Sequence, residues 1–238
     1  MPSLVETMEA ECEYVFAAEL DVRDEWKTVR VFPAFTEMAH RITCRILLGE
    51  ELARDKTFIK ESQSFNRTLF ISAIMVNGIA LGPFRNLVAW LTAAKHRVHL
   101  SRCIKFLLPQ IEKVRSQPKD RNDAVKWMLE LADGDEVESN QGRMAKQLMH
   151  LMFAGSSAPG GLVVQMIYQI LMSPEYLEPL RDEISRTLEE TGGFTASFVS
   201  RLPLMESFVR ETMRLYPTGV GKCFATQPYS VLMPHQYR

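Results

Sequence analysis

The feature that most constrains the fold of this chain is a long uncharged stretch that still carries polar residues. Asp, Glu, Lys and Arg are all absent between Gln147 and Pro174. A segment of this length could cross a bilayer, which requires about 20 predominantly apolar residues. The stretch, however, also contains histidine, serine, glutamine, proline and three glycines, a mixture that matches a membrane span poorly. We therefore expect a buried helix at the centre of a globular fold.

Apolar side chains elsewhere in the first half of the chain recur at helical spacing, which predicts a succession of helices. The first run covers residues 32–46 and stops at Gly49, a residue suited to a helix C-terminus. A second run extends over residues 58–76. A third has its apolar stripe over residues 87–98, and Pro109 is expected to disturb it.

The second half of the chain predicts two further helices. Ser173 and Pro174 are expected to form a cap followed by proline at the first helical position, and this helix continues to Gly192. The last helix is expected over residues 204–216, where the following proline would end it. Its inward-facing residues are expected to be Leu204, Phe208 and Leu215.

Strand signals are almost absent, and only residues 220–231 have a β-like composition. The hydrophobic share of 46% is that of an ordinary globular protein, and the formal charge of −1 argues against nucleic-acid binding, which favours a strongly basic domain. The four cysteines lie far apart without a C-x-x-C pair, which fits a reducing compartment. We therefore expect a mainly α fold with little β, organised as a single domain over residues 1–238.

Local charge is uneven, because the segment from Lys95 to Arg121 is strongly basic. It holds eight Lys and Arg residues against two acidic residues. Such a run is usually a solvated helix face, but it would also suit contact with an anionic membrane surface or an acidic partner. Lys95, Arg102 and Lys105 are spaced so that they can share a helix face, and they are the predicted membrane-surface contacts.

The same segment contains three side chains that could bind a metal ion. His96, His99 and Cys103 stand at positions i, i+3 and i+7, a spacing that could direct three ligands toward one ion. No fourth ligand is evident, and the spacing also arises by chance. We therefore assign no metal site, and keep a small metal-binding helical protein only as an alternative hypothesis.

Three motifs in the second half of the chain occur in a characteristic order. The first is F-A-G-S-S at Phe153–Ser157, the second is P-E-x-x-x-x-L-R-x-E-I at Pro174–Ile184, and the third is E-x-x-R-L-x-P at Glu211–Pro217. In these motifs the chain resembles the cytochrome P-450 monooxygenases, especially the fungal microsomal members that modify secondary metabolites. E-x-x-R alone is a weak signal, whereas the three motifs in this order and spacing are specific.

The resemblance implies a mostly helical fold around a haem whose iron is bound by a cysteine thiolate. It also implies oxidation of a small organic substrate with molecular oxygen and electrons from a reductase, at the cytosolic face of the endoplasmic reticulum. Ala154 and Gly155 would belong to the oxygen-activating helix and face the haem. Glu211 and Arg214 would form a buried structural pair that holds the haem-side core together.

The chain departs from the family pattern in three ways. The family's iron ligand lies in an F-x-x-G-x-x-x-C-x-G loop, which this sequence does not contain, and Cys223 is not assigned that role because it lacks the loop. The acid and the alcohol of the oxygen-activating motif fall on Ser157 and Ala158, so we predict no carboxylate-gated proton relay. The family's membrane anchor and first helices have no counterpart.

These departures from the family pattern leave two hypotheses for the nature of the chain. We expect the central part of a cytochrome P-450, truncated at both ends, that binds haem weakly or not at all by itself. The N-terminus has no basic region followed by an apolar run, so neither a signal nor an anchor is predicted and this chain is expected in the cytoplasm. The alternative is a haem-free helical remnant that binds a partner or a membrane through residues 95–121.

Overall fold

The computed structural model describes residues 2–20, 28–78, 82–117 and 122–217, and these residues form helices without any β-strand among them. The predicted mainly α fold is therefore confirmed, while the β-like residues 220–231 lie outside the described part. The α-helices are α1 (Pro2–Leu20), α2 (Val31–Leu48), α3 (Glu50–Arg54), α4 (Lys56–Gly78), α5 (Arg85–Ser116), α6 (Ala124–Leu131), α7 (Gln141–Met172), α8 (Leu177–Thr191), α9 (Ala196–Val199) and α10 (Pro203–Leu215). Two 3-10 turns, η1 (Gly82–Phe84) and η3 (Pro174–Tyr176), precede α5 and α8.

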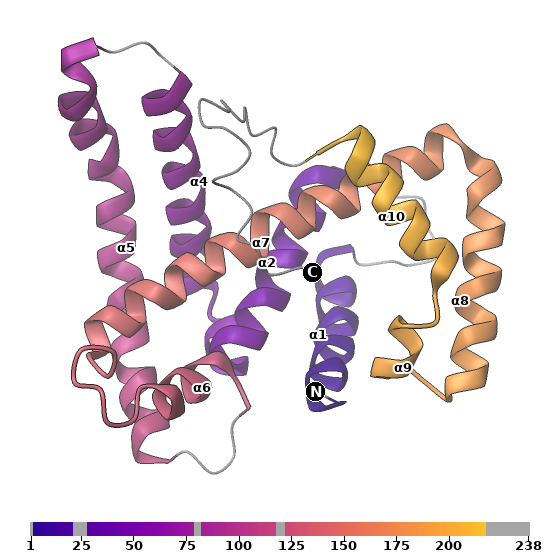
Figure 1. Cartoon of the computed structure of the whole chain (residues 1–238), viewed down its shortest axis with the longest axis horizontal. Coiled ribbons are helices and arrows are strands. Elements are labelled where there is room, and N and C mark those ends of the chain that lie inside the picture. Colours follow the sequence, from indigo (N-terminus) through magenta and orange to yellow (C-terminus); the bar gives the residue numbers. More distant parts are fainter. Residues whose placement is uncertain (1, 21–27, 79–81, 118–121, 218–238) are drawn as a thin grey trace, which may run out of the picture.

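The central element is α7, which contains most of the uncharged stretch (Figure 1). Helix α2 packs along α7, and α4 and α5 form an antiparallel pair that meets its N-terminal half. Helices α8 and α10 lie at the other end of α7. Within the part of the chain that the structure describes, no helix combines the length and the apolar character needed to cross a membrane.

A cluster of buried apolar side chains lies between α2, α3, α4, α5, α6 and α7. Each such side chain contributes about 1.5–3 kcal/mol when it is fully removed from water. This cluster therefore fixes the first half of α7 against its neighbours. Its largest fully buried members are Leu48, Phe58, Phe65, Leu107, Ile111, Met144, Leu148, Met149 and Met152.

Several helix ends follow directly from local sequence. Helix α2 ends at Gly49, whose φ of 88° lies in the region that favours glycine. Helix α7 starts after Asn140, whose side chain accepts a hydrogen bond of 3.0 Å from the Arg143 amide. Helix α8 ends at Gly192 in the left-handed conformation, as the glycine pair predicts.

Two details of the predicted helices are wrong. Ser173 makes no side-chain cap, and Pro174 opens a 3-10 turn in place of the first α-helical turn. Leu204 and Leu215 are 38% and 47% exposed, because α10 packs on α7 and α8 and leaves these side chains partly uncovered. Helix α5 contains Pro109 and continues past it to Ser116, so the disturbance predicted at this proline does not end the helix.

Candidate functional site on α7

Helix α7 presents two different faces along the segment that carries the F-A-G-S-S motif. One face is buried at every fourth position, which places these side chains against the neighbouring helices. The opposite face is uncovered in the described structure. The buried face consists of Met144, Leu148, Met152, Ser156, Gly160 and Val164. The uncovered face, which we call the open face, consists of Leu151, Ala154, Ser157 and Ala158.

The close approach of α2 to α7 depends on two glycines. A Cβ atom on Gly155 would lie 2.7 Å from Cγ2 of Thr43. A Cβ atom on Gly160 would lie 2.9 Å from the Cα of Thr36 and 3.2 Å from the Cβ of Ala39. The distances of 2.7 and 2.9 Å are shorter than real carbon contacts, so any side chain at these two positions would push the helices apart. The glycines of the uncharged stretch therefore set the separation between α2 and α7.

A buried polar cluster joins α2, α4 and α7 beside this crossing. The Nε2 atom of His40 lies 2.7 Å from Oγ of Ser62, and its Nδ1 atom lies 3.0 Å from Oγ of Ser156. All three residues are at most 2% exposed. Burial lowers the pKa of His40 to about 4, and the neighbouring charge of Arg41 acts in the same direction. The cluster thus holds a neutral imidazole between three helices, a role that sequence analysis did not predict.

The predicted site residues of the F-A-G-S-S segment do not all lie on the same face of α7. Ala154, Ser157 and Ala158 lie together on the open face. Gly155 is turned differently, because the position of its absent Cβ points toward Thr43 of α2. The haem-facing role predicted for Ala154 and Gly155 stays a prediction, and the geometry supports it more directly for Ala154.

The predicted burial of Glu211 and Arg214 is wrong for the described chain. The two side chains do form an ion pair, with 2.6 Å between Oε1 of Glu211 and Nη2 of Arg214. They are nevertheless 54% and 67% exposed, so the contacts of α10 with α7 and α8 leave this pair uncovered. Their mutual hydrogen bonds lower the pKa of Glu211 and raise that of Arg214. The motif therefore forms an exposed pair here.

Glu183 is the acidic residue that organises this end of the molecule, and sequence analysis missed it. Its carboxylate accepts hydrogen bonds from the backbone amides of Leu204 and Met205, at 2.8 and 2.9 Å. These amides belong to the first turn of α10, where the helix has no other acceptor for them. The sequence did contain a signal for this residue, because Glu183 belongs to the P-E-x-x-x-x-L-R-x-E-I motif and lies on the buried side of the amphipathic helix α8.

The described cysteines do not fit the role of an iron ligand, which requires an accessible thiolate. Cys44 and Cys103 are fully buried in the core, and burial raises the pKa of Cys103 to about 12 and that of Cys44 further. Burial also raises the pKa of Cys12, which is half-buried on α1. Cys223 lies outside the described residues. No thiolate in the described part of the chain is therefore available to a haem.

The metal-binding alternative also lacks a suitable geometry. Cys103 points into the core, whereas Nδ1 of His99 lies 2.6 Å from a carboxylate oxygen of Glu61 on α4. His96 packs edge-on against the ring of Phe65. Over residues 2–20, 28–78, 82–117 and 122–217, no group of three or more His, Cys, Asp or Glu side chains could hold a metal ion.

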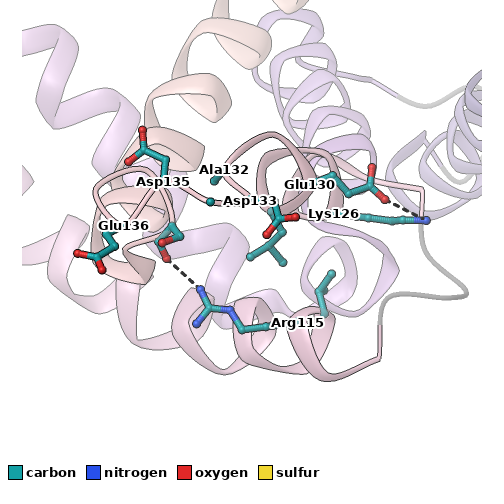
Figure 2. A pocket seen from close by; sticks show the side chains of 11 residues that line it. Arg115, Lys126, Glu130, Ala132, Asp133, Asp135 and Glu136 are labelled. Carbon is teal, nitrogen blue, oxygen red and sulfur yellow. Dashed lines mark hydrogen bonds and ion pairs between the residues drawn. The ribbon is translucent and has the colours of Figure 1, made fainter.

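A hollow of about 700 Å³ lies between the end of α5, helix α6 and the turn after it, and no residue of the F-A-G-S-S motif lines it (Figure 2). Two of its charged groups, Arg115 and Asp135, stabilise this turn. Arg115 donates a hydrogen bond of 2.9 Å to the carbonyl of Ser139. The carboxylate of Asp135 accepts from the amides of Glu138 and Val137, and these bonds lower its pKa. We therefore do not take this hollow as the functional site.

The long, glycine-bearing helix α7 is crossed closely by α2, and the three sequence motifs follow one another in order along the chain. The profile of the family described as cytochrome P-450 matches residues 1–224. The chain belongs to the cytochrome P-450 family.

Two relatives illustrate this membership. Cytochrome P-450 monooxygenase sirB of Leptosphaeria maculans is 33% identical over 239 residues, which cover 97% of this chain and 46% of the relative. Ent-kaurene oxidase of Gibberella intermedia is 27% identical over 222 residues, covering 90% of this chain and 41% of the relative. The chain therefore spans less than half the length of these relatives.

Solved structures show the same fold. A retinoic acid-bound cyanobacterial member of the family superposes with a TM-score of 0.66 at 17% identity, over 90% of this chain and 46% of the other. The haem domain of another cytochrome P-450 gives a TM-score of 0.65 at 17% identity, over 88% and 44% of the two chains. The predicted cytochrome P-450-like helical core is thereby confirmed.

Proposed function

We propose that this chain supplies the central helices, including the oxygen-activating helix, of a haem monooxygenase. The observation that carries the proposal is the arrangement of α7. Its motif segment is fixed against α2 on one side and leaves Ala154, Ser157 and Ala158 uncovered on the other. Haem would supply the activation of oxygen, and electrons would come from a reductase partner, as the membership in this family supports.

The proposed substrate is a small and largely apolar organic molecule, such as a secondary metabolite. The open face supports this class, because Leu151, Ala154 and Ala158 offer apolar surface and Ser157 offers one hydroxyl. The names of the relatives, which include ent-kaurene oxidase, point in the same direction. With no carboxylate among these four residues, we assign Ser157 the task of ordering water at this face.

We also propose that this chain alone binds haem weakly or not at all. The support is chemical, because the described thiols are buried and protonated. A buried thiol with a raised pKa is a poor metal ligand, since the thiolate is the form that binds. The iron ligand of the complete enzyme is therefore to be sought outside the described residues.

One experiment with two proteins tests both proposals. The chain alone and a chimera, in which residues 1–224 replace the matching segment of the Leptosphaeria relative, are each reduced under carbon monoxide. We expect the Soret band of thiolate-ligated haem from the chimera and none from the chain alone. A chimera that melts like its parent but shows no such band would contradict the monooxygenase proposal. A strong band from the chain alone would contradict the second proposal.

A second candidate function, contact with a membrane surface, is supported by the free end of the α4–α5 pair (Figure 1). Seven large apolar side chains there are 49–66% exposed, and we call them the α4–α5 tip. Exposed Lys95 and Lys105 follow on α5, while Arg102 pairs with Glu61 at 3.1 Å. Apolar residues beside basic ones suit an anionic bilayer. The tip comprises Phe70, Ile71, Ile74, Phe84, Leu87, Trp90 and Leu91.

Co-sedimentation with anionic vesicles at low and high salt tests this contact. Changing Lys95, Arg102 and Lys105 to Gln should weaken binding at low salt, because exposed charges are screened as the Debye length falls from about 10 Å at 0.1 M to 3 Å at 1 M. The matched control changes three exposed arginines at the other end of the molecule, and it should bind as the parent does. Binding that is independent of salt and unaffected by the changes at Lys95, Arg102 and Lys105 would exclude the electrostatic contribution. The control residues are Arg181, Arg201 and Arg210.

A further inference from the structure

The interior of α7 contains a proline, and this creates a local problem in hydrogen bonding. In an α-helix the amide of residue i+4 donates to the carbonyl of residue i. Pro159 has no amide hydrogen, so the carbonyl of Gly155 loses the donor that would ordinarily reach it. Gly155 lies within the F-A-G-S-S motif, directly before the serines that reach both faces of α7.

A side chain from α2 supplies a donor at this point. Oγ1 of Thr43 lies 2.8 Å from the carbonyl oxygen of Gly155. The same hydroxyl also lies 2.8 Å from the carbonyl of Ala39, one turn earlier in α2. A hydroxyl has only one hydrogen to donate. Ala39 lies in an uninterrupted helix and already receives the amide of Thr43, whereas Gly155 lacks its amide donor, so Gly155 gains more from the hydroxyl.

The glycine is what allows this contact to form. Because a Cβ at position 155 would lie 2.7 Å from Cγ2 of Thr43, only a residue without a side chain lets the threonine approach the backbone. Three features therefore depend on one another: the missing amide at Pro159, the missing side chain at Gly155 and the hydroxyl of Thr43.

We propose that Thr43 is a positioning residue for the oxygen-activating helix: its hydroxyl replaces the hydrogen bond that Pro159 removes and so fixes the backbone of Ala154–Ala158. The importance of this segment for oxidation rests on the proposed function. The hydrogen bond itself does not, and it can be measured without haem. Failure of the hydrogen bond would therefore leave the monooxygenase proposal standing, and failure of the monooxygenase proposal would leave the hydrogen bond standing.

The sequence offers a direct way to observe this carbonyl. Gly155-Ser156 is the only Gly–Ser pair in the chain. Labelling glycine with 13C at the carbonyl and serine with 15N therefore makes the Gly155 carbonyl the single carbonyl that correlates with a labelled amide. Its 13C chemical shift falls when the carbonyl loses a hydrogen bond, which gives a signature that a general packing role would not produce.

The test compares Thr43→Val with Thr43→Ser, each with Pro159 and with Pro159→Ala. With proline present, Thr43→Val should lower the Gly155 carbonyl shift, and Thr43→Ser should restore the parent value. With alanine at 159, a backbone amide is available again and Thr43→Val should have a much smaller effect. An unchanged carbonyl shift in Thr43→Val, or an equal change in both backgrounds, would overturn the proposal.

Folding of the variants is followed by circular dichroism and by the unfolding midpoint. Thr43→Ala serves as a second variant that removes the hydroxyl. If the hydroxyl-free variants fold only when Pro159 is replaced by alanine, that outcome also supports the proposal, because it shows that the hydroxyl is needed only with proline. If they fail to fold in both backgrounds, the proposal is overturned in favour of a packing role for Thr43.

Discussion

His40 is the described residue whose protonation the fold opposes most clearly. Its ring is 2% exposed and lies between two serine hydroxyls, and its pKa is lowered to about 4 by burial. An unfolded histidine has a pKa of about 6.5. Between these two values the unfolded chain binds a proton that the folded chain does not. Stability contributed by His40 is therefore complete above about pH 6.5 and falls as the pH drops toward 4.

This pKa shift predicts that the free energy of unfolding depends on pH. It should fall by about 3 kcal/mol in total as the pH drops from about 6.5 to about 4. Denaturant unfolding between pH 5 and 6.5 checks it, in a range above the titration of ordinary carboxylates. His40→Gln should flatten the pH dependence even though it lowers stability overall. The exposed His150→Gln is the matched control and should keep the slope. A slope that persists unchanged in His40→Gln would assign the effect to other groups.

The crossing of α2 and α7 makes a prediction at the scale of helices. Gly160→Ala should lower stability by about 1–3 kcal/mol, because the new Cβ would meet the backbone of Thr36 and the helices would have to separate. Gly161→Ala is a closely matched control in the same helix, since a Cβ there meets nothing within 4 Å. It should raise stability by up to about 1 kcal/mol through helix propensity. Equal effects of the two changes on the unfolding midpoint would contradict this view of the crossing.

The α8–α10 contact makes a second prediction for helices, and it concerns two glutamates. Glu183→Ala should cost about 1–3 kcal/mol, because it leaves two amides of the first turn of α10 without an acceptor in a site that is only 6% exposed. Glu211→Ala should give no resolvable change in the unfolding midpoint, since its pair with Arg214 is exposed. The opposite order of effects would mean that the E-x-x-R pair, and not Glu183, supports α10.

These elements also show how far the sequence could predict the fold. Apolar periodicity located α2, α4, α5, α8 and α10, because a helix that packs on a core repeats its apolar residues every three or four positions. The same pattern could not say how much of α10 is covered, so Leu204 and Leu215 were wrongly placed inward. The roles of Thr43 and His40 depend on contacts more than 100 residues away in sequence, and no local pattern carries that information.

At the scale of the whole molecule, the described helices form a cytochrome P-450-like core that spans less than half of its relatives. Membership in the family followed from three motifs whose order and spacing were visible in the sequence. The open face of α7 did not follow from them, because which residues remain uncovered depends on where α2, α4 and α5 pack. Helix α7 is therefore covered on its α2 side and uncovered at Ala154, Ser157 and Ala158.

Thiol labelling tests this claim most directly, in a background where Cys12 and Cys223 are replaced by serine. Cysteines introduced as Ser157→Cys and Ala158→Cys should react quickly with a water-soluble thiol reagent. Ser156→Cys should be protected, because residue 156 is 2% exposed beside His40.

The buried Cys44 and Cys103 serve as internal references for full protection in the same molecule. We expect reaction at 157 and 158, while 156, 44 and 103 stay protected until the chain unfolds. Cysteines at 157 and 158 that react as slowly as the one at 156 would show instead that α7 has no open face.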